Sequence, residues 1–221
     1  MKAYKRNLFT IGLVLIASEI AKQYTLTFQL NQGQYNFWYL PFQLCSIPMY
    51  VCLILPFVSG ERAESALLSF LADFGLLGGI LSFADVSGMH YPLPVLTIHS
   101  YLWHIALILI GIYAGRILTG GTKKETTAWA HSLFFTSFIG AALLYLACCC
   151  IATALNVGLY AKGTINMFYI SPLYPMNQVV FRSFTPYLGN NGTILLYICA
   201  TIAGAFFIHA LRAAITKGTQ R

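Results

Sequence analysis

Charged side chains are scarce in this sequence. They make up 9% of its 221 residues, whereas hydrophobic residues make up 58%. Soluble domains carry roughly 25% charged residues, so this chain lacks the side chains needed to cover a water-exposed surface. Acidic residues are the rarest: six Asp and Glu stand against 13 Lys and Arg, and the net charge is +7. The composition excludes an ordinary soluble domain and predicts an integral membrane protein.

The sequence also lacks the motifs of several function classes. It has neither a glycine-rich phosphate-binding loop nor the basic and aromatic pattern of RNA-binding proteins, so we expect no nucleic-acid partner. It has no CxxC pair and no Cys/His spacing typical of a zinc site. All six cysteines fall in apolar segments, where the disulfides of secreted frameworks are not found, and the triple at 148–150 fits small apolar packing residues. We therefore expect no metal and no cofactor.

What the sequence does contain is a series of long apolar runs. A membrane helix needs about 20 apolar residues, and six segments approach or exceed this length. We predict an all-α, polytopic membrane helix bundle that forms a single domain over residues 1–221. The spans are expected at 8–26, 36–58, 65–84, 98–118, 132–156 and 193–215. The Pro-, Gly- and aromatic-rich region between the last two spans should follow the membrane surface and has room for a short seventh buried segment.

Lysine and arginine are unevenly divided between the predicted loops. Most of them precede the first span, follow the last one or lie in the second and fourth connections: Lys2, Lys5, Arg6, Arg62, Arg116, Lys123, Lys124, Arg212, Lys217 and Arg221. The opposite side has Lys22, Lys162 and Arg182 only. Because cytoplasmic loops carry the excess of Lys and Arg, we expect a multi-pass protein of the cell membrane with both termini in the cytoplasm.

Several polar side chains fall at one depth within these spans. With a rise of about 1.5 Å per helical residue, Cys45 should lie roughly 14 Å and His104 roughly 9 Å from the outer ends of their spans. Glu19 lies in the outer half of the first span, and Gln23 follows one turn later on the same face. Two amide side chains are expected at the same depth in the membrane: Gln43 in the second span and Asn156 at the end of the fifth. Polar residues in hydrocarbon are costly, so this convergence on the outer side suggests a functional site.

Cys45 and His104 form the pair with the clearest chemistry. A nearby imidazole can take the proton of a thiol, and the resulting thiolate can attack an ester carbonyl to form an acyl thioester. The same histidine can then protonate the leaving alcohol and activate the incoming hydroxyl. The alternative is structural: Cys45 as a small packing residue and His104 as a partner in a hydrogen bond between helices.

The remaining polar residues have less specific roles. Glu19 either orients His104 or binds a polar headgroup, or it is a protonated carboxyl that hydrogen-bonds across helices. His99 points about 140° away from His104 on an ideal helix, so it should not share the inward face and ranks second as a ligand. Asp73 is expected to bond another helix and His209 to lie at the membrane interface. Pro48 should kink the second span one turn beyond Cys45 and open space beside it.

Five segments of the chain carry a family resemblance: SEIAKQY (18–24), NQGQYNFWYLPFQLCSIPMY (31–50), FADVSGMHYPL (83–93), SYLWHIALILIGIY (100–113) and ALNVGLYAKGTINMFYIS (154–171). They resemble the YwaF family of bacterial integral membrane proteins. The pattern of that family is a Ser-Glu-Ile stretch in the first helix and Leu-Pro-Leu-(His/Gln)-Leu-Cys-Ser at the second. The likeness covers most of the chain. It departs at Phe42-Gln43, where a histidine is common, and at Asn166-Met167, where Asn-Tyr-Met is expected.

The family is similar to transmembrane protein 164 of animals, an acyltransferase that moves acyl chains onto lyso-ether phospholipids. The resemblance implies that Cys45 is the nucleophile and His104 the catalytic histidine of an acyltransferase or acyl hydrolase. Membrane lipids would then be its substrates or ligands. The candidate substrate-binding residues are Glu19, Gln23, Gln43, His99, Asn156 and Asn166.

Two other function classes remain open. In a transporter or lipid-binding protein, Glu19, Asp73 and His104 would form a path for a proton or solute. The broken helices and internal repeats typical of transporters are weak or missing here. In a purely structural membrane subunit, the polar cluster on the outer side would have no explanation.

Overall fold

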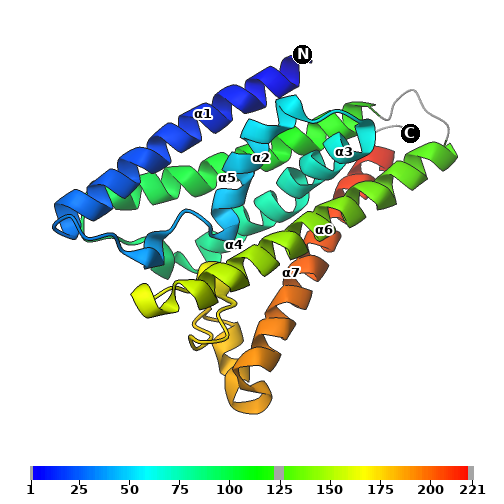
Figure 1. Cartoon of the computed structure of the whole chain (residues 1–221). Coiled ribbons are helices and arrows are strands. Elements are labelled where there is room, and N and C mark those ends of the chain that lie inside the picture. Colours follow the sequence, from blue (N-terminus) through cyan, green and yellow to red (C-terminus); the bar gives the residue numbers. More distant parts are fainter. Residues whose placement is uncertain (1, 122–126, 219–221) are drawn as a thin grey trace.

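The structure, a computed structural model, describes residues 2–121 and 127–218, so Lys123, Lys124 and Arg221 lie outside it. The described part is helical with no β-strand, which confirms an all-α helix bundle. Its α-helices are α1 (Ala3–Tyr24), α2 (Ile47–Ile54), α3 (Glu61–Phe70), α4 (Leu76–Ala84), α5 (Pro94–Gly121), α6 (Thr127–Gly158) and α7 (Thr185–Gly218) (Figure 1). Within the described chain, four helical segments are long and apolar enough to cross a membrane: Glu61–Ala84, Pro94–Gly120, Phe135–Gly158 and Phe181–Ile215.

α1 has the position of the predicted first span but differs from these four in composition. Its apolar side chains Val14 and Ile20 are each 64% exposed, whereas Glu19 is only 3% exposed. Glu19 of α1 therefore faces the bundle, and the face of the helix that contains Val14 and Ile20 is apolar and exposed. This arrangement suits a helix in hydrocarbon, although the inward polar residues lower its overall hydropathy.

The predicted second span is wrong in length. Helix covers only Leu44–Phe57, with α2 at its centre, and the chain before it consists of turns. Proline explains the difference, because it lacks an N–H and clashes with the preceding turn of a helix. Pro41 lies in the non-helical part, and Pro48 lies in the first turn of α2, where proline is tolerated. Pro48 therefore helps to start a helix, and the expected kink beyond Cys45 is absent.

Small residues and stacked rings hold the centre of the bundle together. A Cβ atom at Gly140 of α6 would lie 2.5 Å from the Cβ of Ala66 in α3, so these helices approach as closely as glycine allows. A π-helical turn, Leu71–Gly75, joins α3 to α4. Its Phe74 stacks on Tyr145 of α6 with ring centroids 4.9 Å apart.

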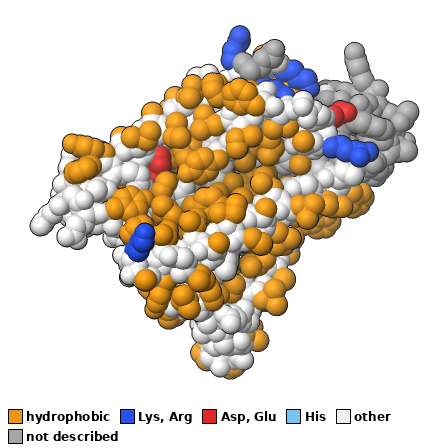
Figure 2. Space-filling view, viewed as in Figure 1, with side chains coloured by type: hydrophobic (Ala, Val, Ile, Leu, Met, Phe, Trp, Pro, Cys, Tyr) orange, Lys and Arg blue, Asp and Glu red, His pale blue; other side chains and the backbone are white. Residues whose placement is uncertain are grey.

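Both ends of the described chain lie at the same end of the molecule (Figure 1). Charged side chains gather there: Lys2 and Lys5 pair with Glu64 at Nζ–O distances of 3.1 and 2.7 Å. Apolar side chains cover the visible flank of the helices (Figure 2). The region between α6 and α7, which had room for a seventh buried segment, contains only short 3₁₀ turns. One of these turns, Met167–Tyr169, begins with two fully buried side chains.

A buried polar cluster around Asp73 joins α7 to the π-helical turn. Asp73 is fully buried, and its Oδ2 lies 2.7 Å from His209 Nδ1 and accepts a hydrogen bond from Ser69 at 2.6 Å. Its Oδ1 accepts from Arg212 Nη2 at 3.2 Å. Asp73 thus bonds another helix, as predicted. The prediction for His209 was wrong: it is 1% exposed rather than interfacial, because its ring turns toward this carboxylate.

Candidate functional site

A cavity of about 570 Å³ lies toward the end of the bundle opposite the termini. This volume falls in the usual range for small-molecule sites. Its wall combines ionisable and polar side chains with many aromatic rings. The polar part includes Lys22, Gln43, Cys45, Asp85, His90, His99, Ser100 and His104, and the aromatic part includes Trp38, Tyr39, Tyr91, Trp103, Phe168, Tyr169, Phe181 and Tyr197.

Cys45 lies at the start of the second helix, in the 3₁₀ turn Leu44–Ser46 that leads into α2. Its backbone carbonyl accepts a hydrogen bond from Trp103 Nε1 at 3.1 Å, which ties this turn to α5. The N-terminus of a helix carries partial positive charge, which favours an anion such as a thiolate. The thiol is half-buried and unpaired. The expected depth of nine helical residues is therefore wrong, but the thiol does lie on the wall of a cavity.

Gln43 also holds the turn Leu44–Ser46 in place, through bonds to the segment that follows α6. Its Nε2 donates to the carbonyl of Asn166 at 3.1 Å, and its Oε1 accepts from the N–H of Phe168 at 2.8 Å. The side chain lines the cavity, but both of its polar ends are engaged by the segment that follows α6. Gln43 therefore acts first as a bridge between two loops.

The hydrogen bonding of His104 determines which of its ring nitrogens can act as a base. Its Nδ1 lies 2.8 Å from the carbonyl oxygen of Ser100. A carbonyl oxygen only accepts, so Nδ1 carries the proton, and the neutral ring has a bare Nε2. In the described part of the chain no hydrogen bond reaches Nε2, and none links a histidine to the Cys45 sulfur. His104 is 8% exposed and lines the cavity, so the bare nitrogen is the form that a general base requires.

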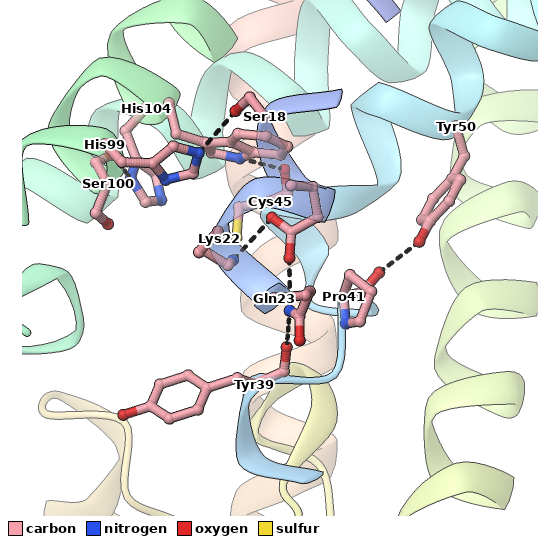
Figure 3. A network of polar contacts seen from close by, with 12 residues as sticks. Ser18, Lys22, Gln23, Tyr39, Pro41, Cys45, Tyr50, His99, Ser100 and His104 are labelled. Carbon is pink, nitrogen blue, oxygen red and sulfur yellow. Dashed lines mark hydrogen bonds and ion pairs between the residues drawn. The ribbon is translucent and has the colours of Figure 1, made fainter. Parts of the chain in front are cut away.

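His99 shares this cavity, contrary to the expectation from the helical wheel. The cavity follows a broad face of α5 that contains His99, Ser100, Trp103 and His104. The angle of about 140° between the two histidines separates them around α5 but does not exclude either from so broad a face. His99 Nε2 lies 2.7 Å from Ser18 Oγ of α1, which fixes its ring (Figure 3).

Lys22, which pairs with Glu19 on α1, lies on the wall of the cavity together with Cys45. Lys22 Nζ lies 2.8 Å from Glu19 Oε2, and Gln23 Nε2 donates to Glu19 Oε1 at 2.7 Å and to the carbonyl of Tyr39 at 2.6 Å. Lys22 lines the cavity, as Figure 3 shows with Cys45 and both histidines. Glu19 and Gln23 lie behind it and line a separate apolar groove between α1 and α2. Glu19 therefore contacts Lys22 and not His104.

Lys22 is the residue that sequence reasoning missed. It was counted as a loop cation because it follows the apolar part of the first span. A signal was present, since Lys22 follows Glu19 at the i, i+3 spacing of neighbours on one helix face. The aromatic lining was equally hard to predict, because its rings come from segments far apart in the chain.

Asn156 and Asn166 do not reach the cavity wall. Asn156 is fully buried in α6, where its Nδ2 donates to the carbonyl of Met167 at 3.0 Å and its Oδ1 accepts from the N–H of Met167 at 2.6 Å. Asn166 donates to Asn177 Oδ1 at 2.9 Å and accepts from the N–H of Ser171 at 3.0 Å. These amides hold the segment that follows α6, so we assign them a positioning role and no contact with a ligand.

Replacing Asn156 by alanine should loosen this segment. The change leaves the buried N–H of Met167 unpaired, which costs about 1–3 kcal/mol, and the Met167 carbonyl keeps only its bond from the N–H of Ile170. Hydrogen exchange at residues 160–171 is expected to quicken in Asn156→Ala, while the exposed control Asn191→Ala leaves it unchanged. Equal exchange in the two variants would contradict the role assigned to Asn156.

The aromatic rings on the cavity wall include tyrosines, whose hydroxyls are hydrogen-bond donors. Tyr39 and Tyr91 lie with ring centroids 5.6 Å apart. Burial raises the pKa of Tyr91, so its hydroxyl keeps its proton at neutral pH and can donate to a ligand. Among the described residues, no three His, Cys, Asp or Glu side chains are grouped as metal ligands.

Comparisons with protein-family models, with curated proteins and with solved structures found no significant match to this chain. The resemblance to the YwaF family therefore remains a prediction from the quoted segments.

Proposed function

We propose that this protein is a membrane acyltransferase or acyl hydrolase that acts on the acyl esters of phospholipids or lysophospholipids. One observation carries the proposal: a thiol at a helix N-terminus and a histidine with a bare Nε2 line the same cavity of a membrane protein. Thiol and imidazole are the groups that covalent acyl transfer requires. The membrane-spanning helices make lipid esters the most accessible substrates.

In the first half-reaction, His104 Nε2 takes the proton of the Cys45 thiol, and the sulfur attacks the ester carbonyl carbon. The tetrahedral intermediate collapses with cleavage of the bond between this carbon and the alcohol oxygen. The protonated His104 returns its proton to that oxygen, so a lysolipid leaves and the acyl group stays on sulfur. No hydrogen bond joins Cys45 to His104 among the described residues, so a bound ester has to bring these groups into reach.

In the second half-reaction, His104 takes a proton from a lipid hydroxyl or from water. The resulting oxygen nucleophile attacks the thioester carbonyl, and the Cys45 thiolate leaves and is protonated by His104. A lipid acceptor makes the protein a transferase, and water makes it a hydrolase. Lys22, held by Glu19, is the cation available on this wall for the phosphate of a headgroup.

We also propose that the protein lies in the cell membrane with both termini in the cytoplasm. The two ends of the chain and the Lys2, Lys5 and Glu64 cluster lie at one end of the bundle, and the cavity lies toward the other. The excess of Lys and Arg at the terminal end supports this orientation. The cavity would then open in the outer half of the bilayer.

A labelling experiment tests the proposed reaction. Purified protein is incubated with vesicles of a phospholipid that carries a labelled acyl chain, and protein-bound label is measured before and after neutral hydroxylamine, which cleaves thioesters. We expect hydroxylamine-sensitive label in the wild type and in Cys199→Ala, which changes an exposed thiol of α7. Label that persists in Cys45→Ala, or no label in any protein, would overturn the proposal.

The transporter alternative is less consistent with the geometry. It requires Glu19, Asp73 and His104 in one path, but Asp73 is bound by His209, Ser69 and Arg212 and does not line the cavity. No specific contact in the described residues links the two clusters.

A further inference from the structure

The cavity extends beyond its polar end into a space between α4 and α7. Leu77, Gly78 and Leu81 line it from α4, and Ala200 and Gly204 line it from α7. Ser82 of α4 and Tyr197 and Thr201 of α7 line the same space, and the Ser82 and Thr201 hydroxyls donate to carbonyls of their own helices. We call this space the α4–α7 slot. The cavity is thus polar at the Cys45 end and largely apolar in the slot.

The slot opens toward the outer surface of the bundle. Leu81 lines the cavity and is nevertheless 55% exposed, and its neighbour Ile80 is 48% exposed. Figure 1 shows the first half of α7 leaning away from α6. Since α4 and α7 both belong to segments able to cross a membrane by length and composition, we expect this opening to face hydrocarbon rather than water.

Glycine leaves free volume in the slot. A Cβ atom at Gly78 would meet nothing within 4 Å, so its place on the cavity wall is open space. At Gly204, a Cβ atom would lie 3.1 Å from a terminal carbon of Leu77. The slot is therefore open beside Gly78 and narrower where α7 approaches Leu77.

We propose that the α4–α7 slot binds the hydrocarbon chain of the acyl group whose carbonyl lies at Cys45, and that Gly78 and Ala200 determine how long a chain is accepted. The inference rests on the proposed function and adds the position of the chain. An ester at Cys45 must place its chain in some apolar space, and the slot is the apolar part of the same cavity. Because the slot opens to hydrocarbon, a lipid can enter sideways with its headgroup at the Lys22 end.

The first test compares two lipids in protein variants that narrow the slot. Ala200→Trp and Gly78→Leu fill it, and leucine also favours helix more than glycine, so Gly78→Leu should fold. Cys199→Trp places the same bulk on the exposed neighbouring position of α7. We expect both slot variants to lower palmitoyl labelling of Cys45 by about tenfold or more, with octanoyl labelling nearly unchanged. Cys199→Trp should match the wild type with both lipids.

The two proposals fail in different ways in this test. Equal loss of palmitoyl and octanoyl labelling, or no loss of either, would overturn the slot as the chain site while the labelled Cys45 still supports acyl transfer. Absence of label from the wild type would overturn the proposed function itself.

A second measurement does not depend on turnover. Cys45→Ala protein is irradiated with a phospholipid that carries a diazirine at the end of its palmitoyl chain, and the crosslinked peptides are mapped. Crosslinks to α4 residues 77–82 and α7 residues 197–204 are expected, and Ala200→Trp in the same background should reduce them. Crosslinks concentrated in the apolar groove of α1 and α2, at Ile20 or Phe28, would place the chain there instead.

Discussion

Replacing His104 by alanine is expected to slow formation of the Cys45 thioester by about 10²–10⁴-fold, the usual contribution of a general acid–base. The reason lies in the ring geometry: Nδ1 donates to Ser100, so the bare Nε2 is the atom able to take the thiol proton. Single-turnover labelling with a phospholipid at saturating vesicle concentration measures this step without product release. The variant should still bind lipid, because the lining of the cavity is otherwise intact.

The pH dependence distinguishes a lost base from a damaged fold. Without His104, only Cys45 thiols that are already ionised can react, and the ionised fraction increases with pH. The residual rate of His104→Ala should therefore rise with pH. His99→Gln provides the matched control, since His99 Nε2 is already engaged by Ser18 and its loss should cost less than about tenfold. Equal losses in the two variants, or a residual rate that does not rise with pH, would contradict the assignment of His104.

The second large effect is expected on stability. Asp73→Ala removes the carboxylate that holds Ser69, His209 and Arg212, and it takes this counter-ion from the partly buried guanidinium of Arg212. Breaking a buried pair on one side typically costs about 3–5 kcal/mol. We expect the free energy of unfolding to fall by that amount in Asp73→Ala, measured by SDS titration in mixed micelles.

A double variant separates the lost pair from a general packing defect. Arg212→Met in the Asp73→Ala background removes the guanidinium charge that Asp73 no longer balances, while it keeps the aliphatic bulk. The double variant should therefore be more stable than Asp73→Ala alone, with a clear interaction energy in the double-mutant cycle. Additive losses would show that the ion pair between α7 and the π-helical turn is not what stabilises this region.

The class of fold could be predicted because it depends on composition and length alone. A chain with 9% charged residues cannot cover itself in water, and hydrocarbon leaves helices and closed barrels as the spanning structures. Continuous apolar runs then predicted the helices from α3 to α7 to within a few residues at most ends. The second span failed because a hydropathy pattern does not register that Pro41 and Pro48 lack the backbone donors of a long helix.

Part of the chemistry of the candidate site could be predicted from the sequence. Cys45 and His104 stood out because a thiol and an imidazole at similar depth are a known reactive combination. The sequence by itself thus determined a membrane helix bundle, and it predicted Cys45 and His104 as a reactive pair. Lys22 and the aromatic lining were not accessible in this way, because each reaches the cavity through a contact between distant segments. His99 was a candidate from the sequence, but its place on the same cavity as His104 depends on the breadth of the α5 face.

Only the tertiary structure decided the remaining points. In the folded chain Lys22 lies on the cavity wall, and Asp73 pairs with His209. Asn156 and Asn166 form hydrogen bonds with the segment after α6. The slot between α4 and α7 likewise exists only in the folded chain. The physical reason is common to all of them: hydropathy along the chain determines which segments enter the membrane, whereas the partner of a polar group inside it depends on how the helices are rotated and packed against each other.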